Sequence, residues 1–176
     1  MPMRTVVLRV VALAMLLLLA IVTGLTVRTL NRLPNSIVYF IKDEGTGFRL
    51  EPAGRKIKTT DDTARLGALL EHLVTGPNSS EKAKGLSTAF PENLEVYKVL
   101  LNDGTVTVDV SYDFEYGGLA SIQGRLNQLF YTLTQANNVE QIVLELNGFQ
   151  TDVISGEGLI IDNPWRREDH TTLPVW

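Results

Sequence analysis

The chain has 176 residues, no cysteine and a formal net charge of −4. This length suffices for one domain with a hydrophobic core, and the lack of cysteine excludes disulfides, thiol nucleophiles, thiolate metal sites and the acylated cysteine of a bacterial lipoprotein. The first 35 residues hold four arginines and no acid, so the remaining residues, with 12 basic and 20 acidic side chains, carry a net charge of −8. Such an acidic body lacks the basic surface that nucleic-acid binding requires.

The N-terminal region predicts a transmembrane helix. Residues 10–27, VVALAMLLLLAIVTGLTV, form a run of 18 residues without a charge, which is the lower end of the length that crosses a bilayer as a helix. Arg4 and Arg9 precede this run, within a short tail of residues 1–9. By the positive-inside tendency, the tail stays in the cytoplasm and the body of the protein is exported.

A cleaved signal peptide is the competing prediction for the same run. Cleavage requires small residues at two positions before the cut, and residues 22–24 (VTG) supply them poorly. Arg28 and Arg32 on the far side weaken the orientation bias without reversing it. We therefore expect an uncleaved signal anchor that passes the cell membrane once. A linker over residues 28–36 follows it, and the body lies on the extracytoplasmic side.

The first half of the body predicts two strands and a helix. Residues 37–41 (IVYFI) are β-branched and aromatic, and residues 48–57 predict a second strand that Pro52 either breaks or keeps at a sheet edge. A helix then begins at the capping residues 59–61 and ends at Gly-Pro, residues 76–77. Its apolar stripe shows helical spacing at Leu66, Leu69, Leu70 and Leu73.

The second half predicts a hairpin, a helix and a last strand. Residues 94–101 form a strand, and residues 102–104 (NDG) form a tight turn because these residue types tolerate positive φ. Residues 105–111 alternate between apolar and polar side chains, as expected for a strand with one buried face. An amphipathic helix over 120–135 and a strand over 140–146 complete the pattern.

This order of elements predicts an α+β domain over residues 37–150. We expect a helix–sheet sandwich, in which two helices pack on one face of a small mixed sheet that contains the hairpin. From residue 151 to residue 176 the pattern fades into glycine, proline and charge, with Trp165 and Trp176 in an otherwise polar tail. The sequence contains no internal repeat.

No motif in the sequence indicates catalysis, cofactor binding or a metal site. The chain has no G-x-S-x-G, no Walker-type loop and no H-E-x-x-H. Its two histidines are His72, beside the apolar stripe of the first predicted helix of the body, and His170, in the tail. They are too far apart in sequence to pair by local spacing. We therefore predict a protein that is not an enzyme and has no catalytic, cofactor-binding or metal-binding residues.

Carboxylates and tyrosines near the hairpin are the remaining candidates for chemistry. Asp109 lies on the polar face of the hairpin, and Asp113 and Glu115 follow closely. Acid–base catalysis requires two carboxyl groups held in a cleft with separated pKa values, so we interpret these residues as solvated charges or acceptors for backbone amides. Tyr112 and Tyr131 could stack on sugars, but single aromatic residues beside helices are more often part of the core.

Six segments occur in an order that resembles a known family. They are VYF (38–40), LGALLEHLVTGP (66–77), GLSTAFP (85–91), DGTVTVDVS (103–111), LFYTLTQ (129–135) and VEQIVLELNG (139–148). Together they resemble the GerMN family of sporulation and spore-germination domains, over about residues 37–148. The resemblance implies a non-enzymatic extracytoplasmic domain with a fold similar to the ring-building motifs of secretion-system and sporulation-channel proteins.

The resemblance also gives Asp109 a place in the family pattern, and the chain departs from that pattern in two respects. Asp109 matches a recurring acidic position on a strand of the family, which is not known as a catalytic residue. The sporulation member carries two tandem domains on a lipid anchor, whereas this chain has one domain behind a predicted transmembrane helix. The tail NPWRREDHTTLPVW has no counterpart in the family.

Three functions remain open from the sequence. The preferred hypothesis is an interaction or assembly module of the bacterial cell envelope, whose partners are other envelope or membrane proteins or further copies of the chain. The alternative is a peptidoglycan or cell-wall glycan binder that uses aromatic platforms such as Trp165 or Tyr112. The third is an envelope hydrolase that uses Asp109 and Glu115, since two carboxylates suffice for glycoside cleavage.

Overall fold

The structure is a computed structural model that describes residues 3–30, 33–136, 138–154, 158–161 and 163–166. The chain divides into two compact units, Met1–Pro34 and Asn35–Trp176, which are described separately. The sequence expectations for Trp176 and His170 fall outside the described residues.

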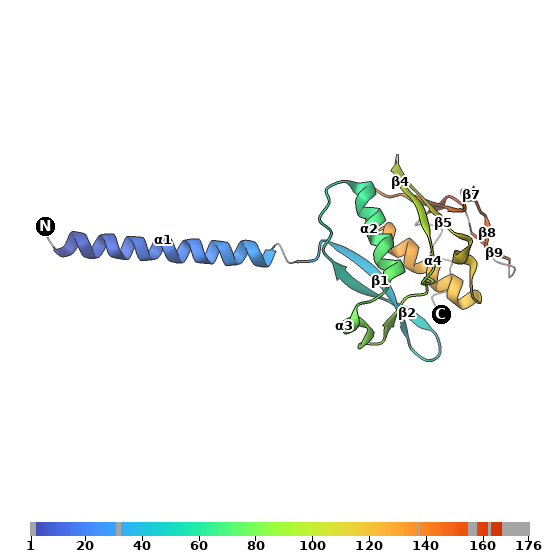
Figure 1. Cartoon of the computed structure of the whole chain (residues 1–176), viewed down its shortest axis with the longest axis horizontal. Helices are drawn as coiled ribbons and strands as arrows, with labels where there is room; N and C mark the ends of the chain where they lie inside the picture. The colour runs from blue at the N-terminus through green and yellow to red at the C-terminus, as the bar shows by residue number, and fades with distance from the viewer. Residues whose placement is uncertain (1–2, 31–32, 137, 155–157, 162, 167–176) are drawn as a thin grey trace. The chain divides into compact units, whose positions relative to one another are not determined.

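The first unit consists of helix α1, Met3–Leu30 (Figure 1). Within it, Val7–Thr29 is long and apolar enough to cross a membrane, with a mean hydropathy of 2.8 in its most apolar window. The hydroxyl groups of Thr23, Thr26 and Thr29 donate to backbone carbonyls one turn earlier in the helix. These bonds satisfy the polar side chains within the helix itself, which suits a helix in a hydrocarbon environment.

The second unit contains a small antiparallel sheet at its start. Strands β1 (Ser36–Asp43), β2 (Phe48–Arg55) and β3 (Leu86–Ser87) lie in the order β2-β1-β3. β2 is therefore an unbroken edge strand, which is one of the two outcomes predicted from Pro52, since proline cannot donate a backbone hydrogen bond to a neighbour.

A larger mixed sheet carries the predicted hairpin. Its order is β10-β6-β5-β4, where β4 is Val96–Asn102, β5 is Thr105–Val110, β6 is Gln141–Leu146 and β10 is Trp165–Arg166. The turn between β4 and β5 has Asp103 at φ 45° and Gly104 at φ 76°, as the NDG signal predicts. β4 and β5 pair antiparallel, whereas β5 and β6 pair parallel.

Two helices pack between the sheets and bury most of the core (Figure 1). Helix α2 (Asp62–Thr75) contacts β1 of the small sheet and β4 of the large one. Helix α4 (Leu119–Leu133) is the crossover between the parallel strands β5 and β6, and it packs against α2 and β1. The α+β class, the two packed helices and the hairpin are thus confirmed, while the described strands divide into these two sheets and a third, two-stranded one, where the sequence predicted a single sheet.

The edge of β1 explains why the sheets stay separate. β3 pairs only with the C-terminal part of β1, at Ile41 and Lys42. Nearer its start, the backbone of β1 forms hydrogen bonds with three side chains that lie about one helical turn apart. Two of them belong to α4, and the third, Gln135, follows directly after it. These bonds join Gln128 to the Tyr39 carbonyl, Thr132 to the Tyr39 amide, and Gln135 to the amide and carbonyl of Ile37. A helix thus satisfies an edge that another strand would otherwise occupy.

Several short elements follow or interrupt the predicted ones. The predicted loop after α2 contains helix α3 (Ser79–Lys82), which begins with a capping box between Asn78 and Glu81. The loop after β5 contains the 3₁₀ helix η1 (Tyr112–Glu115). Strands β7 (Phe149–Gln150), β8 (Val153–Ile154) and β9 (Leu159–Ile160) follow β6.

The chain beyond residue 150 contributes to the same core. Trp165 is 4% exposed, pairs with Ile142 of β6, and lies 4.8 Å from Phe130 between ring centroids. Ile154 and Ile161 are also buried in this core. The predicted boundary between domain and tail, at residue 150, therefore falls between elements that pack together in the structure.

Candidate functional site

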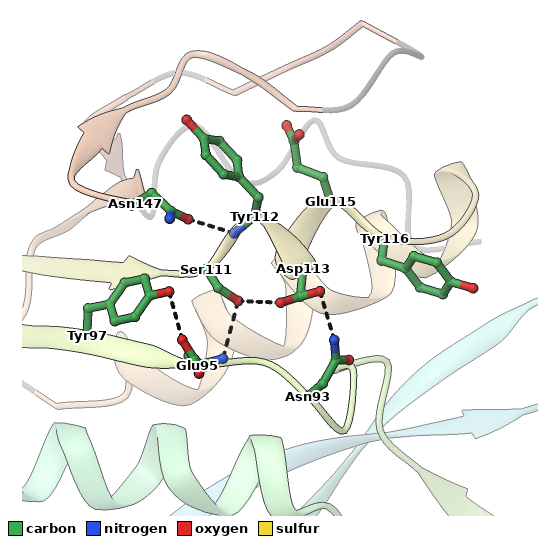
Figure 2. A pocket seen from close by; sticks show the side chains of 9 residues that line it. All are labelled: Asn93, Glu95, Tyr97, Ser111, Tyr112, Asp113, Glu115, Tyr116 and Asn147. Carbon is green, nitrogen blue, oxygen red and sulfur yellow. Dashed lines mark hydrogen bonds between the residues drawn. The ribbon is translucent and has the colours of Figure 1, made fainter.

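A shallow hollow opens where β4 begins and where β5 and β6 end (Figure 2). Its volume is about 730 Å³. The side chains that line it are polar or aromatic, and they come from the loop before β4, from β4, from η1 and from the turn after β6. They are Asn93, Glu95, Tyr97, Ser111, Tyr112, Asp113, Glu115, Tyr116 and Asn147.

Hydrogen bonds hold the floor of the hollow in one arrangement. The Ser111 hydroxyl and the Asn93 amide each donate to Asp113, at 2.9 and 2.8 Å. Ser111 also accepts from the Glu95 backbone amide and donates its own amide to the Glu95 carbonyl. On the far side, the Asn147 side chain accepts from the Tyr112 amide at 2.9 Å. These bonds join all three chain segments of the hollow (Figure 2).

Three tyrosines surround this floor and remain exposed. Tyr97, Tyr112 and Tyr116 are 50%, 55% and 77% exposed. The Tyr97 hydroxyl donates to Glu95 at 2.9 Å, and this bond raises the pKa of Tyr97 above its usual value. Figure 2 shows the rings of Tyr112 and Tyr116 directed away from the hydrogen-bonded floor, where they are available to contact another molecule.

A buried arginine fixes the position of η1. Arg125 of α4 is 2% exposed, and its guanidinium donates to the carbonyls of Ala89, Phe114 and Tyr116. It also lies 5.3 Å from the centroid of the Phe114 ring. Burial lowers the pKa of Arg125 to about 10, so the group stays cationic at neutral pH. Through these bonds, α4 holds the segment that carries Tyr112 and Tyr116 in the hollow.

Asp109 does not belong to the hollow. Its side chain is 8% exposed and accepts a 2.8 Å hydrogen bond from the Gly148 backbone amide. On the neighbouring strands, Lys98 and Glu145 form an ion pair of 2.6 Å. Asp109 is thus an acceptor for a backbone amide, as the sequence interpretation expected. The carboxylates of Asp109 and Glu115 were considered as a pair for glycoside hydrolysis, and only Glu115 lines the hollow.

The other aromatic and histidine candidates lie elsewhere. Trp165 is buried against Phe130, so the hypothesis that it forms a sugar platform is wrong. Tyr131 is partly buried and stacks with Tyr39 at 5.9 Å between centroids. His72 is half-buried at the end of α2, and burial together with Arg55 lowers its pKa. Of the sugar-stacking candidates, only Tyr112 lines the hollow.

The chemistry available in the hollow is that of carboxylates, amides, one hydroxyl and three phenols. Among its lining residues, the Ser111 hydroxyl donates to the Asp113 carboxylate, and no histidine lines the hollow. Within the described parts of the chain, no cluster of three or more metal-ligating side chains could hold a metal ion.

Three of the nine lining residues, Tyr112, Asp113 and Glu115, are candidates that the sequence indicates, whereas the other six are not. Glu95 and Tyr97 appear in the sequence as ordinary polar and aromatic residues at the start of a strand. They reach η1 only because β4 and β5 pair antiparallel, which brings the start of β4 to the end of β5. Asn147 joins them because β6 runs parallel to β5. The sequence signal that could have indicated the hollow is the recurrence of tyrosines near strand ends, at Tyr97, Tyr112 and Tyr116.

The fold of the protein is similar to that of solved GerMN domains. The first GerMN domain of the sporulation protein GerM from Bacillus subtilis aligns with a TM-score of 0.63 and 21% identity, over 76% of this chain and 98% of that domain. The tandem GerMN domains of the same protein align with a TM-score of 0.59 and 22% identity, over 75% of this chain. The alignment spans 44% of the tandem structure.

A candidate lipoprotein from Clostridium perfringens aligns with a TM-score of 0.55 and 20% identity, over 76% of this chain and 87% of that one. A search of curated protein sequences gave no match. The family model named Germane, described as sporulation and spore germination, matches residues 37–152. Because this match covers more than half of the chain, and the solved GerMN domains share its fold, the protein belongs to the Germane family of sporulation and spore-germination domains.

Proposed function

We propose that the protein is a membrane-anchored interaction module of the cell envelope, which binds a protein partner through the hollow at the end of the large sheet. The observation that carries this proposal is the group of three exposed tyrosines around a rigid polar floor. Tyrosine is enriched at the centres of protein interfaces, since it offers a large contact area at a low entropic cost. A floor already fixed by hydrogen bonds further reduces the cost of ordering on binding.

Family membership and helix α1 support the placement in the envelope. α1 contains a segment that can cross a membrane, and the Germane family is described by sporulation and spore germination. We propose a single pass with the body outside the cytoplasmic membrane, following the arginines before the apolar run. Protease added to intact spheroplasts should degrade the body. A body that is protected until the membrane is lysed would contradict this orientation.

The assembly proposal is tested on the full-length protein extracted gently from its own membranes. We expect native electrophoresis to show a discrete complex larger than the free chain. Replacing both Tyr97 and Tyr116 by serine should dissociate it, because these rings lie at the surface of the hollow. Glu71→Gln on the exposed face of α2 serves as the control and should leave the complex intact. A complex that survives the tyrosine variant would place the interface elsewhere.

A cell-wall glycan binder is the second candidate function. Tyr112, Asn93 and Asn147 lie in the same hollow, and an aromatic ring beside amide groups is a common arrangement for stacking a sugar and hydrogen-bonding its hydroxyls. Purified sacculi should then retain the wild-type protein and release the Tyr112→Ser variant. If the protein stays in the supernatant at physiological salt, this candidate is excluded.

A further inference from the structure

The charge of the hollow restricts what the proposed partner can present to it. Glu95, Asp113 and Glu115 supply three carboxylates, and none of the nine described lining residues is basic. An incoming anion would meet like charge, whereas a cation would be attracted by the carboxylates. The hollow therefore favours a cationic group.

The tyrosines favour the same kind of group for an independent reason. The face of an aromatic ring carries negative electrostatic potential and attracts a cation placed over it. Tyr97, Tyr112 and Tyr116 are exposed around the hollow. A guanidinium is planar, stacks on such rings, and can donate two parallel hydrogen bonds to a carboxylate, whereas an ammonium acts as a compact point charge. Arginine thus fits the hollow better than lysine.

Two of these carboxylates, Asp113 and Glu95, are held in place without losing their capacity to accept. Each oxygen of Asp113 accepts one internal bond, from Asn93 or Ser111, and Glu95 accepts from Tyr97. An ionised carboxylate offers about four acceptor positions, so these bonds orient the group and leave positions for a ligand. Such pre-orientation lowers the cost of binding.

The position of the hollow indicates how a partner chain would reach it. β4 is the terminal strand of the large sheet, and Glu95 and Tyr97 lie at its start. Val96 and Leu100 along this strand are 41% and 48% exposed. An extended segment lying beside β4 could cover these apolar side chains and place one side chain in the hollow, as in strand-addition recognition.

From this charge complementarity we propose that the hollow binds an arginine side chain on an extended segment of the protein partner. The inference rests on the proposed function and specifies the chemistry of the partner. It makes a cationic side chain, and not a glycan or an anion, the group that occupies the hollow.

The test uses the full-length protein in phosphatidylcholine nanodiscs, labelled with ¹³C on its tyrosine rings. The chain has five tyrosines, so Tyr39 and Tyr131, which stack together outside the hollow, are internal controls. The probes are peptides Thr-Val-X-Val-Thr with blocked ends, where X is arginine, lysine, citrulline or glutamate. Citrulline has nearly the shape of arginine but no charge.

We expect the arginine peptide to shift the signals of Tyr97, Tyr112 and Tyr116 and to leave the two control signals in place. Lysine should bind more weakly, citrulline weaker still, and glutamate should not bind. Glu95→Gln should weaken arginine binding by about two- to five-fold, the range for a partly exposed ion pair. Glu71→Gln, matched in charge change on α2, should have no effect.

Each other outcome decides against the inference in a distinct way. If citrulline binds as well as arginine, and Tyr116→Ser still abolishes binding, then the hollow is an interface without charge selection, and the proposed function survives alone. If muropeptides shift the three tyrosines and the arginine peptide does not, the glycan candidate replaces both proposals. If no probe shifts them and the Tyr97/Tyr116 variant keeps the native complex, the inference and the proposed function both fail.

Discussion

The hollow and a basic recess beside helix α2 differ in whether their side chains are paired within the protein or exposed to solvent. The recess lies around the end of α2 and the start of α3, and Arg55, Lys56, His72 and Lys82 are among its lining residues. There, Arg55 makes two hydrogen bonds with Glu81, at 2.6 and 2.7 Å, and both side chains are nearly buried, at 11% and 13% exposed. Arg55 also lies 5.2 Å from the centroid of the Phe40 ring.

This difference distinguishes a region that stabilises the fold from the hollow that we propose binds a partner. Beside the recess, Glu81 links α3 to β2, because it pairs with Arg55 of β2 and closes the capping box of α3 at Asn78. In the hollow, internal bonds fix the floor, while the three tyrosine rings stay exposed. Charged groups with internal partners stabilise a fold, whereas exposed aromatic rings around a fixed floor gain free energy only when another molecule covers them.

The largest expected effect comes from the buried arginine that supports the hollow. Arg125→Met should lower the free energy of unfolding by about 3 kcal/mol, because it leaves buried carbonyls without their donor. Chemical unfolding followed by tryptophan fluorescence measures the change. Arg49→Met removes an arginine from exposed ion pairs and should cost less than about 1 kcal/mol. Equal losses in the two variants would contradict the supporting role of Arg125.

A smaller loss of stability is expected when the ion pair between Arg55 and Glu81 is removed. Glu81→Gln should cost about 2 kcal/mol at neutral pH, in the range for hydrogen bonds to charged groups. The hydrogen bond from Arg55 holds the pKa of Glu81 below its ordinary value. The unfolded chain therefore binds a proton more readily than the folded one, and stability is lost as pH falls from about 4.5 through the folded-state pKa. In melting experiments at pH 3 to 7, the variant should lose less stability on acidification.

His72 should add a second pH dependence in a higher range. Burial and the neighbouring Arg55 lower its pKa below 6.5. Since the unfolded chain again binds the proton more readily, acidification from pH 6.5 downwards destabilises the folded protein. His72→Gln should reduce the difference in melting temperature between pH 7.5 and pH 5.5. An unchanged difference would show that other groups cause the dependence.

The smallest effect on stability is expected in the hollow itself. Tyr116 is 77% exposed, so Tyr116→Ser should change the free energy of unfolding by less than about 0.5 kcal/mol, as is usual for surface substitutions. The same variant should weaken partner binding measurably. Loss of stability comparable to that of Glu81→Gln would mean that the hollow is a structural region like the recess.

The sequence by itself determined the apolar α1, the two amphipathic helices and the NDG hairpin. Each follows from signals within a few residues of one another: an uncharged run, helical spacing of leucines, or residues that tolerate positive φ. It also indicated Tyr112, Asp113 and Glu115, because they are close together in the chain.

Only the tertiary structure decided the division into separate sheets, the burial of Trp165 and the composition of the hollow. Gln128, Thr132 and Gln135 close the edge of β1 across about ninety residues of chain, and a polar side chain that serves a distant backbone has no local signature. Trp165 joins the core because β10 pairs with β6. Glu95 and Asn147 meet η1 through strand pairing. Such contacts depend on which strands pair and in which register, which the local pattern does not specify.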